Sequence, residues 1–198
     1  TVSLSGAGSV IEGSSGVYTV SLTSVAQSDV TVTLSYSGTA GNGTDISGTT
    51  TVTVLAGTSS RNFNVSAISD SIYEGIENFT ILLDSATGGN FEDLQLAAPG
   101  AGGSITASVV DIDSAPTIST VSAASATEAS SIVHTVTLSN ASTTATTFAL
   151  SLGGGTATGS GTDYTSTLVD ANFSNGVTIS GGTITVPAGV TSFMVSVP

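Results

Sequence analysis

The feature that most constrains this 198-residue chain is an internal repeat. Three blocks of sequence occur twice and in the same order, so chance is a poor explanation. The matched pairs are residues 11–23 with 127–139, 38–46 with 155–164, and 53–57 with 185–189. Self-similarity of this kind indicates consecutive copies of one structural unit. We therefore predict two domains, one in residues 1–114 and the second in residues 115–198.

Within each copy, apolar and polar residues alternate with a period of two. Val30, Val32 and Leu34 alternate with Thr and Ser, and residues 148–152 and 193–197 show a similar pattern in the second copy. This alternation is typical of strands with one buried face, and the breaks rich in Gly and Asn indicate turns. We predict no helix, a loop over residues 90–103, and a longer hairpin around residues 172–182. The fold expected is all-β, with antiparallel sandwiches in tandem.

The balance of charge excludes several classes of partner. The chain has 14 acidic residues against a single basic one, Arg61, and a net charge of −13. Nucleic acids and anionic membrane surfaces need a basic footprint, so neither is an expected partner, and no segment is expected to insert directly into a membrane. The chain has no cysteine, which excludes disulfides and zinc–thiolate sites. A dissolved cation is the obvious substitute for the missing basic residues.

Several runs resemble the signature of Calx-β domains. They are residues 70–80, the two blocks that contain Gly-Thr-Asp at 43–45 and 161–163, and residues 109–113. The resemblance covers nearly all of residues 1–114 and the first two thirds of the second repeat. It implies an immunoglobulin-like sandwich of about seven strands in each repeat, with the second sandwich incomplete in this chain. It also implies calcium bound among the loops at one end of the sandwich.

The same resemblance implies a set of Ca²⁺ ligands at matching positions. The carboxylates are Glu12, Asp45, Asp70, Glu74, Asp111 and Asp113, and the carbonyl of Ile72 is a further ligand. Calcium takes about 6–8 oxygen ligands in flexible geometry, which such a set can supply. The second copy keeps only the equivalents of two of them, Glu128 and Asp163.

The second repeat ends level with Ser66 of the first and lacks the counterparts of about two strands. A sandwich without them would expose apolar surface and a sheet edge. We therefore expect the missing strands to come from downstream sequence or from a neighbouring molecule, by strand complementation. The expected partners are neighbouring repeats of the same protein. The chain has no signal peptide and begins at Thr1, so we expect it to be a segment of something longer.

No arrangement of residues favours an enzyme. The only histidine, His134, falls on a predicted strand, and no His–Asp pair accompanies the many Ser and Thr residues. Glu74 and Glu77 have the residue types of a glycosidase acid–base pair, but no aromatic sugar platform accompanies them. The chain is therefore not expected to be an enzyme.

Two functions stay open at this point. The first is a calcium-binding structural or adhesive module of an extracellular, cell-surface protein or filament. In this role Ca²⁺ would stiffen the junction around Pro116, whose ring restricts the backbone of the linker. The alternative is a module whose exposed loops bind a carbohydrate or a host protein.

Overall fold

The computed structural model describes all residues from Thr1 to Pro198, and it confirms the all-β prediction. The one helical element is a single 3₁₀ turn, η1 (Asp170–Asn172). No helix therefore has the length and apolar character needed to pass through a membrane. The chain forms two compact units: Thr1–Asp70 with Gly75–Ile112, and Ser71–Glu74 with Asp113–Pro198.

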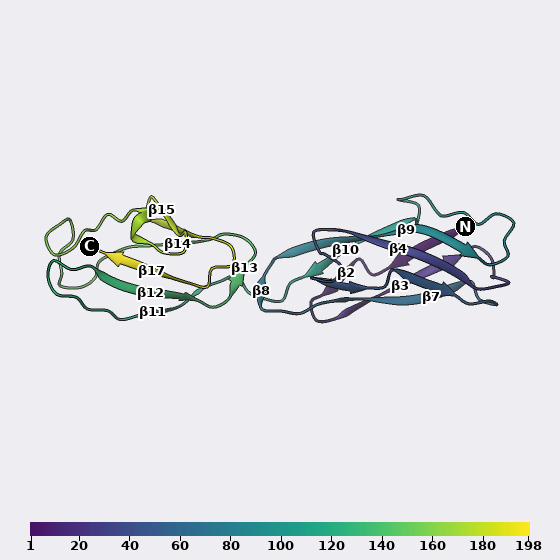
Figure 1. Ribbon diagram of the computed structural model, residues 1–198, viewed down its shortest axis with the longest axis horizontal. Helices are drawn as coiled ribbons and strands as arrows, with labels where there is room; N and C mark the ends of the chain where they lie inside the picture. The colour runs from purple at the N-terminus through teal and green to yellow at the C-terminus, as the bar shows by residue number, and fades with distance from the viewer. The chain divides into compact units, whose positions relative to one another are not determined.

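The first unit is a sandwich of two sheets (Figure 1). One sheet has the order β1-β3-β7-β5, from β1 (Val2–Gly6), β3 (Ser15–Leu22), β7 (Ser60–Ala67) and β5 (Ile46–Gly48). The other has the order β2-β10-β9-β4-β6, from β2 (Ser9–Ile11), β10 (Ser104–Val110), β9 (Ile76–Gly88), β4 (Val30–Gly38) and β6 (Thr51–Val54). All pairs are antiparallel except β2 with β10. The segment between β9 and β10 is an irregular loop, as predicted.

The alternation read from the sequence decides which residues enter the core of the first unit. The first three alternate residues of β4, from Val30 to Leu34, are buried, and β9 contributes three buried residues in the same way: Phe79, Ile81 and Leu83. Aromatic rings are few, and they meet near the centre. The ring centroid of Tyr18 on β3 lies 5.8 Å from that of Phe63 and 6.1 Å from that of Phe79. The rings of Tyr18 and Phe79 are in an edge-to-face arrangement. This geometry is favoured between aromatic rings and helps to fix how the sheets pack.

The second unit has three smaller sheets (Figure 1). The first pairs β11 (Ile118–Val121), β12 (Ile132–Leu138) and β17 (Ser192–Val197) in that order. The second has the order β14-β16-β15, from β14 (Thr146–Ala149), β16 (Thr183–Val186) and β15 (Thr178–Ser180). The third pairs β13 (Ala141–Ser142) in parallel with β8 (Ile72–Tyr73), a segment from between β7 and β9 in the sequence.

The predicted hairpin around residues 172–182 appears as β15 and β16. Two glycines, Gly181 and Gly182, join the strands, and both have a positive φ, of 56° and 78°. Two-residue hairpin turns with positive φ match the right-handed twist of the strands, and glycine adopts them without steric cost. The inserted residues of the second repeat therefore form a local hairpin on one side of β16.

The two units share their strand register. Val30 pairs with Val54 in the first unit, and Thr146 pairs with Val186 in the second. The amide of Leu34 donates a hydrogen bond to the carbonyl of Thr50 at 2.9 Å. In the same way, the amide of Leu150 donates to the carbonyl of Gly182 at 2.8 Å. Strands β14 and β16 are thus the counterparts of β4 and β6, position by position.

Candidate metal site

Five acidic side chains of the first unit stand where its strands begin or end. Glu12 directly follows β2, and Asp45 directly precedes β5. Asp70 lies three residues after β7, Glu77 is the second residue of β9, and Asp111 directly follows β10. Because these strands belong to both sheets, their ends bring together residues that are far apart in sequence.

Glu12 is the most buried of these carboxylates, with a relative exposure of 9%. Its Oε1 accepts a hydrogen bond from the amide of Asp70 at 2.8 Å, and its Oε2 accepts one from the amide of Ile112 at 3.2 Å. The two bonds span 58 and 100 residues of sequence. Glu12 therefore ties the segment after β7 to the segment after β10. A carboxylate oxygen of Glu12 also lies within 4.8 Å of one from Asp70.

Asp45 and Glu77 form a second close pair, with carboxylate oxygens within 4.8 Å of one another. The loop before β5 fixes Asp45, because its Oδ2 accepts from the amide of Gly41 at 2.6 Å and from the hydroxyl of Thr44 at 3.0 Å. Glu77 is half-buried, and its Oε2 is a buried atom with no hydrogen-bond partner. Burial, with the negative charges of Asp45 and Asp111, raises the pKa of Glu77.

Asp111 lies on the same side of the unit. Its Oδ2 accepts a hydrogen bond from the amide of Gly75 at 2.8 Å, which links the start of β9 to the end of β10. Its charge also acts on Glu77, so the two carboxylates share one electrostatic environment. Two carboxylates about 4 Å apart repel each other by about 4 kcal/mol in a medium of intermediate dielectric. A bound cation or a proton between them removes this repulsion.

The other three predicted ligands belong to the segments grouped with the second unit. Ile72 is in β8 and pairs with Ala141. Glu74 immediately precedes Gly75, and Asp113 immediately follows Ile112, so each borders the first unit along the chain. Both acids are half-buried. Of the predicted ligands, the first unit itself holds Glu12, Asp45, Asp70 and Asp111.

Glu77 was not among the predicted ligands. The sequence does contain a signal that marks Glu77 as a site residue. A glutamate at an inward-facing position of an apolar strand is unusual. In β9 the buried residues are the odd-numbered ones from Phe79 onward, and Glu77 falls on the same alternation. A charge placed on the buried face of a strand needs a counter-charge or a proton.

The chemistry of this acidic pole (Glu12, Asp45, Asp70, Glu77 and Asp111) fits a hard divalent cation. All its donors are carboxylate oxygens, the ligand type that calcium prefers, and there is no histidine or cysteine among them. Several of these oxygens already accept one amide hydrogen, but a carboxylate oxygen has a second lone pair for a metal. The buried, unpartnered oxygen of Glu77 is an atom that such an ion would satisfy.

Two family models match the chain. The model of the LapA domain matches residues 1–108, which is more than half of the chain, and the model of the Calx-beta domain matches residues 111–189. The chain belongs to the LapA domain family. Its second part is recognised as a Calx-beta domain, which confirms the resemblance found in the sequence. Over the first repeat the matching family is LapA, although the two repeats share their register.

No curated protein matches the chain, but several solved structures resemble it. The crystal structure of CBD12 from CALX1.2 is 18% identical, with a TM-score of 0.46, over 98% of this chain and 73% of that one. The calcium binding domain CBD12 of CALX1.1 is 20% identical, with a TM-score of 0.46, over 97% and 72%. The apo form of the Calx CBD1 domain is 22% identical, with a TM-score of 0.44, over 57% and 98%.

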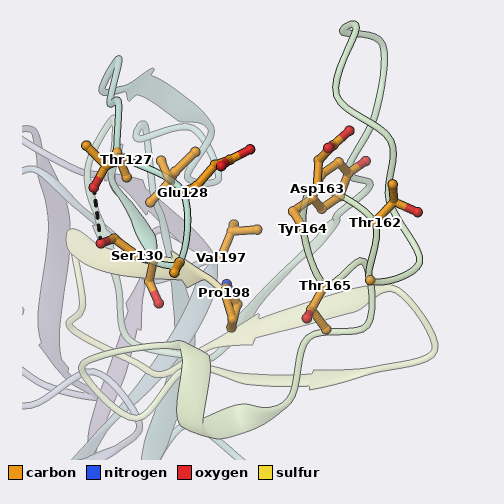
Figure 2. Close-up of a pocket in the computed structure, with 14 residues that line it drawn as sticks. Thr127, Glu128, Ser130, Thr162, Asp163, Tyr164, Thr165, Val197 and Pro198 are labelled. Atoms are coloured by element: carbon orange, nitrogen blue, oxygen red, sulfur yellow. Dashed lines mark hydrogen bonds between the residues drawn. The ribbon is translucent and has the colours of Figure 1, made fainter.

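In the Calx-beta unit, the counterparts of the acidic pole surround an open cavity of about 400 Å³. Figure 2 shows Glu128 and Asp163 on opposite sides of it, with Val197 and Pro198 between them. Both acids are exposed. The Oδ2 of Asp163 accepts a hydrogen bond from the amide of Thr158 at 2.6 Å. The Oδ2 of Asp45 accepts the equivalent bond from the amide of Gly41, so the two loops share this hydrogen bond. No third acid lines this cavity.

Proposed function

We propose that the chain is a calcium-binding structural module, in which Ca²⁺ is held by the acidic pole of the LapA unit. The observation that carries this proposal is the presence of two close carboxylate pairs, Glu12 with Asp70 and Asp45 with Glu77, together with a buried oxygen of Glu77 that has no hydrogen-bond partner. The proposed role is binding and mechanical, without catalysis, in a protein of the cell surface.

The proposed ligands extend to the acids that adjoin the pole along the chain, Glu74 and Asp113, with the carbonyl of Ile72. Asp113 begins the linker to the Calx-beta unit, which contains Pro116. Without a cation, repulsion between the carboxylates would favour separation of the segments that carry them. With Ca²⁺ bound, the start of the linker would be fixed next to the LapA unit, and Pro116 would restrict the rest. Calcium would thereby stiffen the joint between modules of an adhesive surface protein.

Calorimetric titration of the chain with CaCl₂ tests the proposed binding. We expect saturable heat with CaCl₂ and weaker binding of MgCl₂, because magnesium demands a tighter octahedral geometry, whereas calcium accepts the flexible arrangement of oxygen ligands that separate loops supply. Asp111→Asn should weaken calcium binding about tenfold or more, since it removes one charged ligand. Glu92→Gln, on an exposed loop residue outside the pole, is the matched control and should bind as the parent chain does. Absence of calcium binding in the parent chain would refute the proposal.

The proposed stiffening has a separate test. Spin labels at Ser24→Cys and Ser180→Cys would report the distance between the units, and the chain has no other cysteine to react. Both positions are exposed, one in each unit. We expect calcium to narrow the measured distance distribution, and Asp111→Asn to keep it broad at the same calcium concentration. An equally broad distribution with calcium and with chelator would show that binding does not stiffen the joint.

A further inference from the structure

The two units differ at one inward-facing position, on the counterpart strands β7 and β17. Val20 of β3 lies opposite Arg61 of β7. Val136 of β12, which matches Val20 in the repeat, lies opposite Phe193 of β17. Arg61 therefore takes the position of Phe193, which is a core residue of the Calx-beta unit with an exposure of 1%. The only basic residue of the chain thus stands where the other repeat buries an aromatic ring.

In the Calx-beta unit, the inserted segment covers this position. Phe173, which follows η1, lies with its ring centroid 6.5 Å from that of Phe193. The amide of Ser174 donates to the carbonyl of Met194 on β17 at 3.1 Å, and the hydroxyl of Ser174 accepts from the amide of Met194 at 2.7 Å. The LapA unit lacks the insertion, so the same side of its sandwich stays open.

The open side of the LapA unit is a groove of about 330 Å³ beside β6 and β7. Its most buried lining residues are Val52 and Phe63, with exposures of 4% and 9%. Arg61 lies two residues before Phe63 on β7, so the two side chains leave the same face of the strand. The rest of the lining consists of Thr49, Thr51, Thr53, Leu55 and Asn62. The volume is at the lower end of the range for ligand sites and suits a short sugar.

The charge in this groove has no partner within the protein. The guanidinium of Arg61 is exposed and makes no ion pair or hydrogen bond, although the chain has 14 acidic residues. None of these acids lines the groove. A guanidinium presents a planar fork of donors that matches the two oxygens of a carboxylate. The groove is therefore the place on this acidic chain where a carboxylate meets an attractive charge.

The edge of β6 favours a sugar over an added peptide strand. The hydroxyl of Thr49 donates to the carbonyl of Thr51 at 2.9 Å and accepts from the amide of Thr51 at 3.3 Å. This part of the edge is thus already bonded and offers no continuous ladder to a strand. The hydroxyls of Thr51 and Thr53 each donate and accept, as the hydroxyls of a sugar do. Leu55, which is 48% exposed, adds apolar surface for the C–H groups of a ring.

We propose that this groove binds a carboxylated sugar of the uronic acid class. The carboxylate pairs with the guanidinium of Arg61, the ring hydroxyls bond to Thr51 and Thr53, and the apolar part of the ring contacts Leu55. The groove lies beside the start of β7, whereas Asp70 of the acidic pole follows the end of that strand. The sugar site is therefore separate from the proposed calcium site and does not depend on it.

Titration of the chain with digalacturonic acid, in chelator, tests the site without a contribution from calcium. Residue-resolved spectra should show saturable shifts at Thr53, Arg61 and Asn62. The methyl ester of the same disaccharide should bind about tenfold or more weakly, because it loses the charge-assisted hydrogen bonds. Acetate and a tetraglutamate peptide should also bind about tenfold or more weakly, since they lack the ring hydroxyls. No binding of digalacturonic acid, or equal binding of any of these three probes, would overturn the proposal.

Arg61→Gln and Ser180→Asp are matched variants, because each makes the net charge more negative by the same amount. Arg61→Gln loses the guanidinium fork and should weaken binding about tenfold or more. Ser180→Asp, at an exposed position of the Calx-beta unit, should bind as the parent chain does. Arg61→Lys keeps the charge without the fork and should lie between the parent and Arg61→Gln. Equal losses in Arg61→Gln and Ser180→Asp would overturn the proposal. So would unchanged binding in Arg61→Gln, because Arg61 would then only protect a sheet edge.

Discussion

Replacing Glu12 with glutamine is expected to lower the free energy of unfolding of the LapA unit by about 2–3 kcal/mol, even in chelator. The carboxylate of Glu12 accepts amide hydrogens from Asp70 and Ile112 on two different segments. Glutamine keeps the size of the side chain but has one acceptor oxygen, so its NH₂ group must face one of these amides. That amide is left without a partner, and burial of the site prevents water from replacing it fully.

The internal repeat provides a matched control for this prediction. Glu128 is the counterpart of Glu12, and it is exposed on the rim of an open cavity. Glu128→Gln is therefore expected to leave stability unchanged within about 0.5 kcal/mol, as most surface substitutions do. Urea unfolding followed by residue-resolved spectroscopy in each unit would measure both effects. Equal effects for the two variants would mean that Glu12 does not connect the two segments as its hydrogen bonds indicate.

Much of the fold could be predicted from the sequence because its determinants are local. The alternation of Val30, Val32 and Leu34 specifies a strand and its buried face within a few residues. The inserted hairpin at Gly181 and Gly182 also follows from residues adjacent in sequence. The repeat adds to this, because the register of a strand in one copy predicts the register of its counterpart in the other. The pairing of β4 with β6 and of β14 with β16 has this shared register.

The features that could not be predicted depend on contacts between distant segments. Residues 72–73 show no strand pattern of their own, and they form β8 only because residues 141–142 offer a parallel edge. The connecting role of Glu12 depends on amides 58 and 100 residues away, so the sequence could suggest a ligand but not this scaffold role. Glu77 was missed as a site residue for a related reason. Its place in the alternation of β9 can be read from the sequence, but the charges of Asp45 and Asp111, which together with burial raise its pKa, come from segments next to other strands.

Glu77→Gln is expected to change stability in opposite directions with and without calcium. In chelator, the variant should melt at a higher temperature than the parent chain. The substitution removes a charge that burial and the carboxylates of Asp45 and Asp111 disfavour, which is the reason that the pKa of Glu77 is raised. The amide keeps nearly the same volume, so packing around the start of β9 is preserved.

With calcium present, the same substitution removes a ligand. A calcium concentration of about 100 times the dissociation constant stabilises the parent chain by about 2.7 kcal/mol, and a tenfold weaker affinity reduces this to about 1.4 kcal/mol. For a unit of about 100 residues, each kcal/mol corresponds to about 4 °C or more in melting temperature. Calorimetric melting of the parent, Glu77→Gln and the exposed control Glu92→Gln, each in calcium and in chelator, would separate the two effects. A calcium-induced shift in Glu77→Gln as large as that of the parent would place the metal away from the buried oxygen of Glu77, and Glu77 would then not be a ligand.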